Sequence, residues 1–159
     1  MIYMKWVTRE KAKVDRIACP WLISRFIDKN PEFIFVPKDH VLKVAKEQNA
    51  IPFDTPGAEL HHFKENDREY VSFDAIIKKY GLKDPALLEL AKIVRSADVT
   101  LPDPEPEGAG LEAAAIGFRL ISADDRENMK LQFPLYDALY AYCKWKIKEG
   151  GKLEHSKSK

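Results

Sequence analysis

The sequence contains little cysteine and little glycine. Its two cysteines, Cys19 and Cys143, lie far apart in a chain of 159 residues, so they form neither a disulfide framework nor a zinc cluster. The seven glycines are scattered, and none belongs to a glycine-rich loop of the kind that cradles a phosphate. We therefore expect free thiols, a cytoplasmic location and no nucleotide cofactor.

Long apolar runs and an excess of charge are also missing. No apolar stretch approaches the roughly 18 residues that a membrane-spanning helix needs, and the first residues do not resemble a secretory signal. The 26 lysine and arginine residues nearly balance 25 acidic ones, which leaves a net charge of +1. We therefore expect neither a membrane partner nor direct binding to nucleic acid.

The remaining composition is that of a globular domain, with 45% hydrophobic and 32% charged residues. A chain of this length is large enough to build one hydrophobic core without disulfides or metal staples. We predict a single domain over residues 1–149, followed by a disordered polar tail over residues 150–159. The sequence does not indicate an oligomeric state.

The order of the apolar patterns predicts an α+β fold. Short strand-like segments alternate with helical patterns at first, which indicates a small mixed, partly parallel sheet in the N-terminal half. From Ser72 onward the pattern is helical, so we expect a predominantly helical C-terminal half to pack on that sheet. The predicted strands are 3–8, 33–36, 51–53 and an edge strand at 59–63, and residues 64–69 are predicted as a loop. The predicted helices are 20–28, 41–45, 73–80, 85–98, 111–121 and 128–148.

The first helix carries the most distinctive chemistry. Proline is tolerated at the first position of a helix and costs about 3 kcal/mol inside one, so we predict that this helix begins at Pro20 with Cys19 as its cap. A thiol at that place faces free backbone N–H groups, which lower its pKa. Cys19 is therefore a candidate catalytic residue, and the alternative is a buried structural cysteine.

Two arginines accompany this predicted helix start. A cation beside a helix N-terminus is unfavourable unless a negative group lies there too, and for Arg16 that group is either Asp15 or a bound anion. Free amides at helix N-termini bind tetrahedral anions. We predict that Arg16 holds a small oxyanion and that Arg25 supports it.

A second candidate site combines one histidine with carboxylates. His61 and His62 point to opposite faces if they lie on a strand, so only one of them enters a shared site. We predict that His62, Asp98, Asp124 and Asp125 hold a divalent metal ion, and this ligand type suits Fe, Mn or Zn. The alternatives are a buried ion pair for Asp98 and ordinary helix caps for the two adjacent aspartates.

Several segments, in order along nearly the whole chain, resemble the C-terminal domain of the chromate-resistance protein ChrB family. The set is more specific than any single segment in it. The matching segments are KWVTRE (5–10), DRIACPWLISRFID (15–28), FDTPG (53–57), SFD (72–74), KYGL (79–82), IVRSAD (93–98) and YDALY (136–140).

The resemblance implies a role in chromate resistance. Relatives with an additional N-terminal portion are thought to regulate chromate-efflux genes, so a chain of this length corresponds to the sensing or chemical part. Three functions remain open: an accessory or sensor domain that binds an oxyanion such as chromate, a small metal-dependent enzyme with possible redox activity, and a non-catalytic interaction module. The last would use the acidic, proline-rich loop at residues 102–107.

Overall fold

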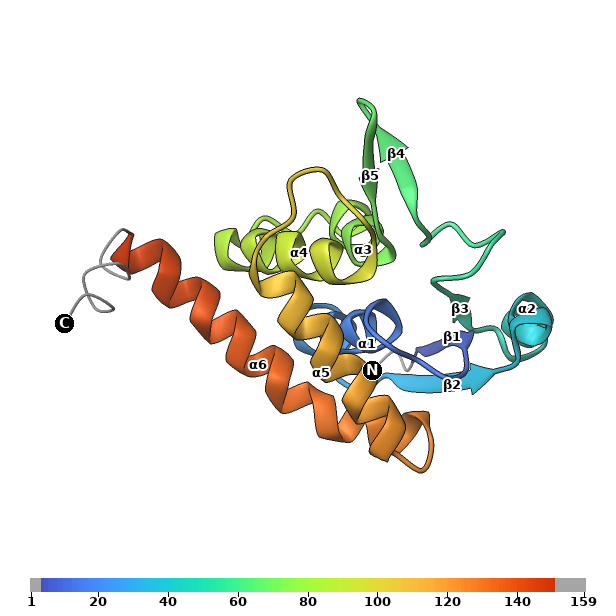
Figure 1. Ribbon diagram of the computed structural model, residues 1–159. Helices are drawn as coiled ribbons and strands as arrows, with labels where there is room; N and C mark the ends of the chain where they lie inside the picture. The colour runs from blue at the N-terminus through green and yellow to red at the C-terminus, as the bar shows by residue number, and fades with distance from the viewer. Residues whose placement is uncertain (1–3, 151–159) are drawn as a thin grey trace.

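The computed structural model describes residues 4–150 and confirms the α+β fold (Figure 1). Of the predicted tail, residues 151–159 lie outside the described residues. The strands are β1 (Lys5–Arg9), β2 (Glu32–Val36), β3 (Ile51–Pro52), β4 (Phe63–Glu65) and β5 (Arg68–Tyr70). The helices are α1 (Asp15–Phe26), the short 3-10 helix η1 (Lys38–His40), α2 (Val41–Gln48), α3 (Ser72–Lys79), α4 (Pro85–Asp98), α5 (Glu107–Ile121) and α6 (Asp125–Glu149).

The three strands of the N-terminal sheet are parallel, in the order β2-β1-β3. The central strand β1 contains Trp6 and Val7, whose side chains point to opposite faces of the sheet, and both residues are fully buried. Each face of the sheet is therefore covered, as parallel strands require. The sheet confirms the predicted strands at 33–36 and 51–53, and β1 overlaps the one predicted at 3–8.

The predicted edge strand at 59–63 and the predicted loop at 64–69 are both wrong. Residues 53 and 60 form one isolated bridge, and the chain then makes an antiparallel hairpin from β4 and β5. Asn66 and Asp67 take left-handed backbone conformations at its turn, with φ of 53° and 62°. Asparagine and aspartate tolerate this region, which two-residue hairpin turns need. Phe63 and Tyr70 stack across the hairpin with ring centroids 5.0 Å apart.

Helix α1 begins at Asp15 and not at Pro20, so the predicted start is wrong. Pro20 lies inside the helix and cannot donate the hydrogen bond that the Arg16 carbonyl would otherwise accept. Ile17 and Leu22, on either side of the proline, are completely buried. Burying this apolar face offsets the cost of the lost bond, because each fully buried aliphatic side chain contributes about 1.5–3 kcal/mol.

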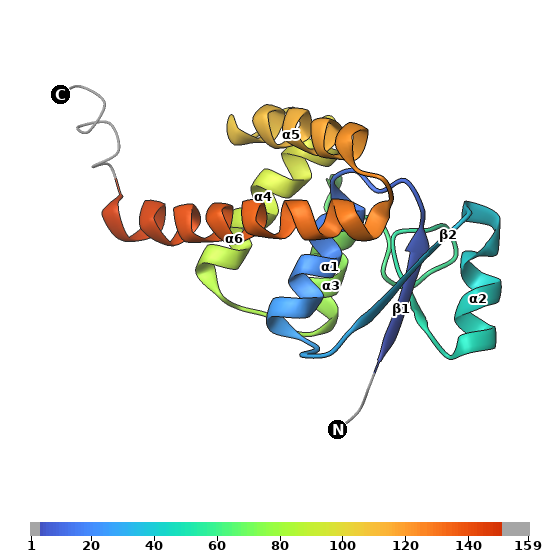
Figure 2. The same cartoon turned by 90° about the horizontal axis from the view of Figure 1, so that it is seen from below.

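The C-terminal helices form a layer around α1. Helix α4 packs against α5 and α6, and α1 packs against α3 and α6 (Figure 2). Asp84 caps α4 by accepting hydrogen bonds from two backbone N–H groups, with Pro85 at the first helical position as predicted. Tyr136 and Cys143 of α6 are fully buried, whereas Ile147 near the helix end is 48% exposed.

Within residues 4–150, no helix has both the length and the apolar character that crossing a membrane requires.

Replacing Gly108 by alanine tests the close contact between α4 and α5. A Cβ atom at Gly108 would lie 2.5 Å from the Ser96 Cβ and 2.8 Å from the Ser96 carbonyl carbon. We expect G108A to lower the free energy of unfolding by about 1–3 kcal/mol in urea denaturation, because the backbone must shift. The matched control is G117A, since a Cβ there meets no atom within 4 Å and alanine favours helix. Equal stability of the two variants would contradict this packing.

Candidate functional site

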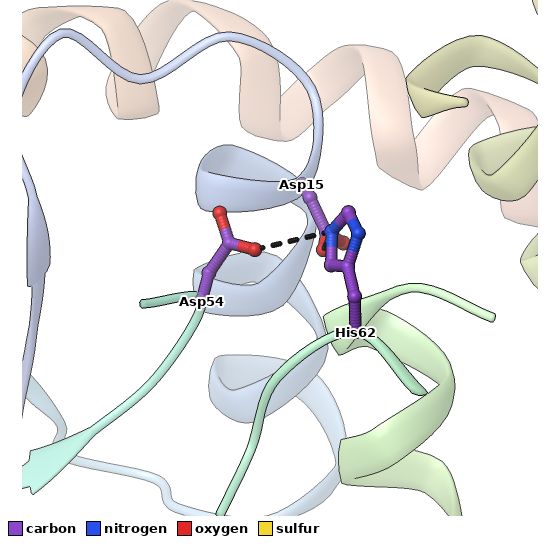
Figure 3. Close-up of side chains that lie close together, drawn as sticks. All are labelled: Asp15, Asp54 and His62. Carbon is purple, nitrogen blue, oxygen red and sulfur yellow. Dashed lines mark ion pairs between the residues drawn. The ribbon is translucent and has the colours of Figure 1, made fainter. Parts of the chain in front are cut away.

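Three carboxylates from separate parts of the chain meet around one nitrogen of the His62 imidazole. The His62 Nε2 atom lies 3.5 Å from Asp15 Oδ2, 3.4 Å from Asp54 Oδ1 and 3.3 Å from Asp98 Oδ2. Asp15 is the first residue of α1, Asp54 follows β3, His62 precedes β4, and Asp98 ends α4. Figure 3 shows the first three of these side chains converging.

Asp15 is fixed by the start of helix α3. The N-cap of that helix is Val71, which has no side-chain oxygen to accept from the free amides of the first turn. The Asp15 carboxylate supplies the missing acceptor from α1, with Ser72 N donating at 2.8 Å and Phe73 N at 3.1 Å. Only 2% of Asp15 is exposed. This interaction joins α1 to α3 and holds the carboxylate rigidly beside His62.

Asp54 is held by one hydroxyl and two guanidinium groups. The Ser72 hydroxyl donates to Asp54 Oδ1 at 2.7 Å, and Arg9 and Arg16 approach Oδ2 at 3.5 and 3.7 Å. The Arg9 Nε–H also donates to the backbone carbonyl of Asp54 at 2.9 Å. The backbone of Asp54 has φ of 52°, a left-handed conformation that aspartate tolerates. These contacts turn Oδ1 toward His62.

The cluster binds a proton strongly. Hydrogen bonds to Asp15, Asp54 and Asp98 raise the pKa of His62 to about 12. Burial, together with repulsion from Asp54, raises the pKa of Asp15 to about 7. Burial also opposes ionisation of Asp54, but the bonds from His62 and Ser72 outweigh it and lower the pKa of Asp54. A positive charge among the three carboxylates is therefore strongly favoured.

The same atoms fit a metal ion. Ligand atoms of Asp15, Asp54 and His62 all lie within 4.8 Å of one another. One imidazole with carboxylates, and no sulfur, is a ligand set that suits Mn, Fe or Zn. Asp98 does not belong to this group of three, but its Oδ2 lies 3.3 Å from His62 Nε2, and Asp98 lines a cavity of about 370 Å³ between α4, the start of α5 and residues 99–106.

Comparison with known proteins identifies the family. The profile of the family described as ChrB, C-terminal domain, matches residues 6–143. The chain belongs to this family. The curated Protein ChrB of Cupriavidus metallidurans is 33% identical to this ChrB domain over 139 residues, which are 87% of the chain and 40% of that protein. The chain thus spans less than half the length of this relative. No solved structure significantly matches this chain.

Two of the four predicted metal ligands of the ChrB domain lie in the cluster, namely His62 and Asp98. The other two stand at the start of α6. Asp124 caps that helix by accepting from Glu127 N at 2.9 Å. Asp125 accepts from the backbone N–H groups of two residues just before α1, at 2.8 and 2.7 Å. Neither belongs to a group that could hold a metal ion among the residues that the structure describes.

The two predicted anion-binding arginines lie on different sides of the ChrB domain. Arg16 contacts Asp54 in the cluster, whereas Arg25 pairs with Asp137 of α6 at 2.9 Å and is 42% exposed there. The two arginines are nine positions apart in α1, which at about 100° per residue places them about 180° apart around the helix. Because Pro20 does not start the helix, both arginines belong to one continuous α1 and face opposite ways.

Cys19 has the reverse of the predicted character. Its thiol is fully buried one turn after Asp15, and Cys19 Sγ lies 3.5 Å from Asp15 Oδ1. Burial and the negative charges of Asp15 and Asp54 raise the pKa of Cys19 well above its usual value. The predicted lowering of this pKa was wrong, because it depended on a helix start at Pro20.

Asp54 is a member of the cluster that the sequence did not predict, and Asp15 was predicted only as a partner for Arg16. The available signal was the position of Asp54 directly after a parallel strand, because ligand sites of parallel sheets lie at the carboxyl ends of the strands. For Asp15 no local signal exists, since its partner amides are 57 and 58 residues away in the sequence.

Thiol labelling tests the burial of the cysteines. We expect a thiol-specific aromatic disulfide at pH 7.5 to modify neither Cys19 nor Cys143 in the native domain, since both are fully buried and have raised pKa values. Both thiols should react within minutes in 6 M guanidinium chloride, which serves as the control. Rapid labelling of one native thiol that persists in a C143S variant would show that Cys19 is accessible after all.

Proposed function

We propose that this ChrB domain binds one divalent metal ion through Asp15, Asp54 and His62, with Asp98 as a further ligand. The observation that supports the proposal is the approach of three carboxylates to a single imidazole nitrogen, all within 3.5 Å. Two of these carboxylates are almost completely buried, where an unbalanced negative charge is costly. A divalent ion relieves that cost better than one proton does.

Mn(II), Fe(II) and Zn(II) are the ions that this ligand set favours. An ion held by three or four protein ligands would leave room for water or substrate, and it would supply a Lewis acid, or a redox centre if it is Fe or Mn. The protein's part is to hold the carboxylates in place from α3 and Arg16 and to keep His62 directed inward. Asp98 also lines the cavity at the end of α4, and His62 lines a second cavity formed with residues of α3.

We further propose that the site responds to an oxyanion such as chromate, in a cytoplasmic chromate-resistance system. Membership of the ChrB family supports the connection with chromate resistance. Arg9 and Arg16 beside Asp54 support the anion, because the Arg16 Nε–H is buried and has no hydrogen-bond partner among residues 4–150. The free, buried thiols of Cys19 and Cys143 support the reducing location.

An interaction module remains the third possibility, but no observation favours it. Acidic side chains of the proline-rich loop are engaged within the same chain. Asp103 pairs with Arg68 at 2.9 Å, and Glu107 at the start of α5 accepts from the Tyr142 hydroxyl at 2.7 Å.

Metal analysis of ligand variants tests the main proposal. Protein prepared without an affinity tag and incubated with Mn(II), Fe(II) under anaerobic conditions, or Zn(II) should retain about one equivalent of at least one ion after desalting. D15N and H62A should lose at least about 100-fold in affinity, because each removes or weakens a ligand. D124N is the matched control: asparagine is an equally good helix cap, so both stability and metal binding should persist. Less than a tenth of an equivalent in the unmodified domain would contradict the metal site.

Thermal unfolding with sulfate tests the anion. Sulfate is a tetrahedral dianion like chromate but does not oxidise the protein. We expect 10 mM sodium sulfate to raise the Tm of the metal-loaded domain by a few degrees relative to chloride at equal ionic strength, since a ligand of the folded state stabilises it. R16Q should remove this shift and R25Q should keep it. Equal shifts in both variants would place the anion elsewhere, and no shift in the unmodified domain would contradict anion binding.

A further inference from the structure

The hairpin of β4 and β5, residues 63–70, forms an arm that stands away from the body of the domain (Figure 1). Among the described residues, its two strands pair with each other and with no other strand. Three side-chain contacts join the arm to the rest of the domain: Lys78 of α3 lies over the Phe63 ring, Arg95 of α4 lies over the Tyr70 ring, and Arg68 pairs with Asp103 of the loop between α4 and α5. The Arg68 and Lys78 contacts are exposed and individually weak, so local opening of the arm should cost little beyond the loss of the more buried Arg95–Tyr70 contact.

Both ends of the arm are tied to the four-residue cluster. His62 immediately precedes β4, and its Nε2 faces the three carboxylates. Two residues after β5, Ser72 contacts two of the same carboxylates, since its N–H donates to Asp15 at 2.8 Å and its hydroxyl donates to Asp54 at 2.7 Å. The residues that flank the arm on its two sides, His62 and Ser72, therefore contact the same carboxylates. An ion bound by the cluster would lie at the base of the hairpin.

We infer that metal occupancy controls the position of the β4–β5 arm, with Ser72 as the residue that couples the two. This inference rests on the proposed metal site. When the arm moves away, it displaces His62 at one end and Ser72 at the other. The site then loses the His62 ligand, and Asp15 and Asp54 lose the hydrogen bonds from Ser72 that position them. An ion that binds only the closed arrangement must then hold the arm closed, and by linkage the attachments of the arm must raise metal affinity.

Hydrogen–deuterium exchange measures this coupling directly. Backbone amides of residues 63–70 should exchange up to about 100-fold more slowly when the free ion is at 100 times its dissociation constant, if opening the arm abolishes binding. Mn(II) or Zn(II) is the probe, whichever is bound in the metal analysis. The internal control is α2, which packs against β1 and makes none of the cluster contacts, so its exchange should change less than twofold.

Two variants separate the coupling from the metal site itself. S72A keeps all four proposed ligands but loses the hydroxyl bond to Asp54, so it should retain one equivalent of metal while protection of the arm falls at least about threefold. The double variant R68A/K78A removes exposed attachments of the arm and touches no ligand, so metal affinity should fall about 3-fold to 10-fold. The double variant K43A/K46A, which removes two exposed lysines from α2, is the control for the loss of two positive charges.

The outcomes distinguish the two proposals. Tight binding of metal with less than a twofold change in arm exchange overturns the coupling and leaves the metal site standing. Equal slowing of the arm and of α2 also overturns it, because that result is general stabilisation. Failure of the unmodified domain to bind any ion overturns the metal site and the coupling with it.

Discussion

The bonds between the Asp15 carboxylate and the first amides of α3 are the interaction on which the rest of the site depends. They complete a helix start that valine cannot cap, and they bring a buried negative charge to the middle of the domain. A buried carboxylate needs hydrogen bonds and a compensating positive charge. Two amides, His62 and the nearby Arg16 supply these here, so the capping of one helix and the electrostatics of the cluster have a single cause.

The charge balance explains why acidic and basic groups alternate outward from the centre. Asp15, Asp54 and Asp98 surround His62, and Arg9 and Arg16 stand behind Asp54. The arginines offset the repulsion among the carboxylates without occupying the space between them. The proposed function uses the inner position for a metal ion and the outer edge, beside the arginines, for a negatively charged ligand.

How much of this could be read from the sequence depends on the range of each interaction. Sequence patterns predicted the structure correctly where the cause is local. Asp84 and Pro85 mark the start of α4, and Tyr136 and Cys143, seven residues apart, lie on the same buried face of α6. These patterns failed at Pro20, where tertiary burial overrides a backbone preference. The hairpin was missed because its strands are short and charged. In the site, His62 and Asp98 carried a signal of their own, whereas the roles of Asp15 and Asp54 arise from partners distant in the chain.

The place of α6 has a consequence for the synthesis of the chain. Tyr136 and Cys143 complete the same core cluster as Ile17 and Trp21, although more than a hundred residues separate them. During translation the side of α1 that packs on α6 therefore remains uncovered until nearly the whole domain has left the ribosome, although α3 can cover another side earlier. Exposed apolar surface of this kind promotes aggregation, so rapid synthesis of α6 favours correct folding of the nascent domain.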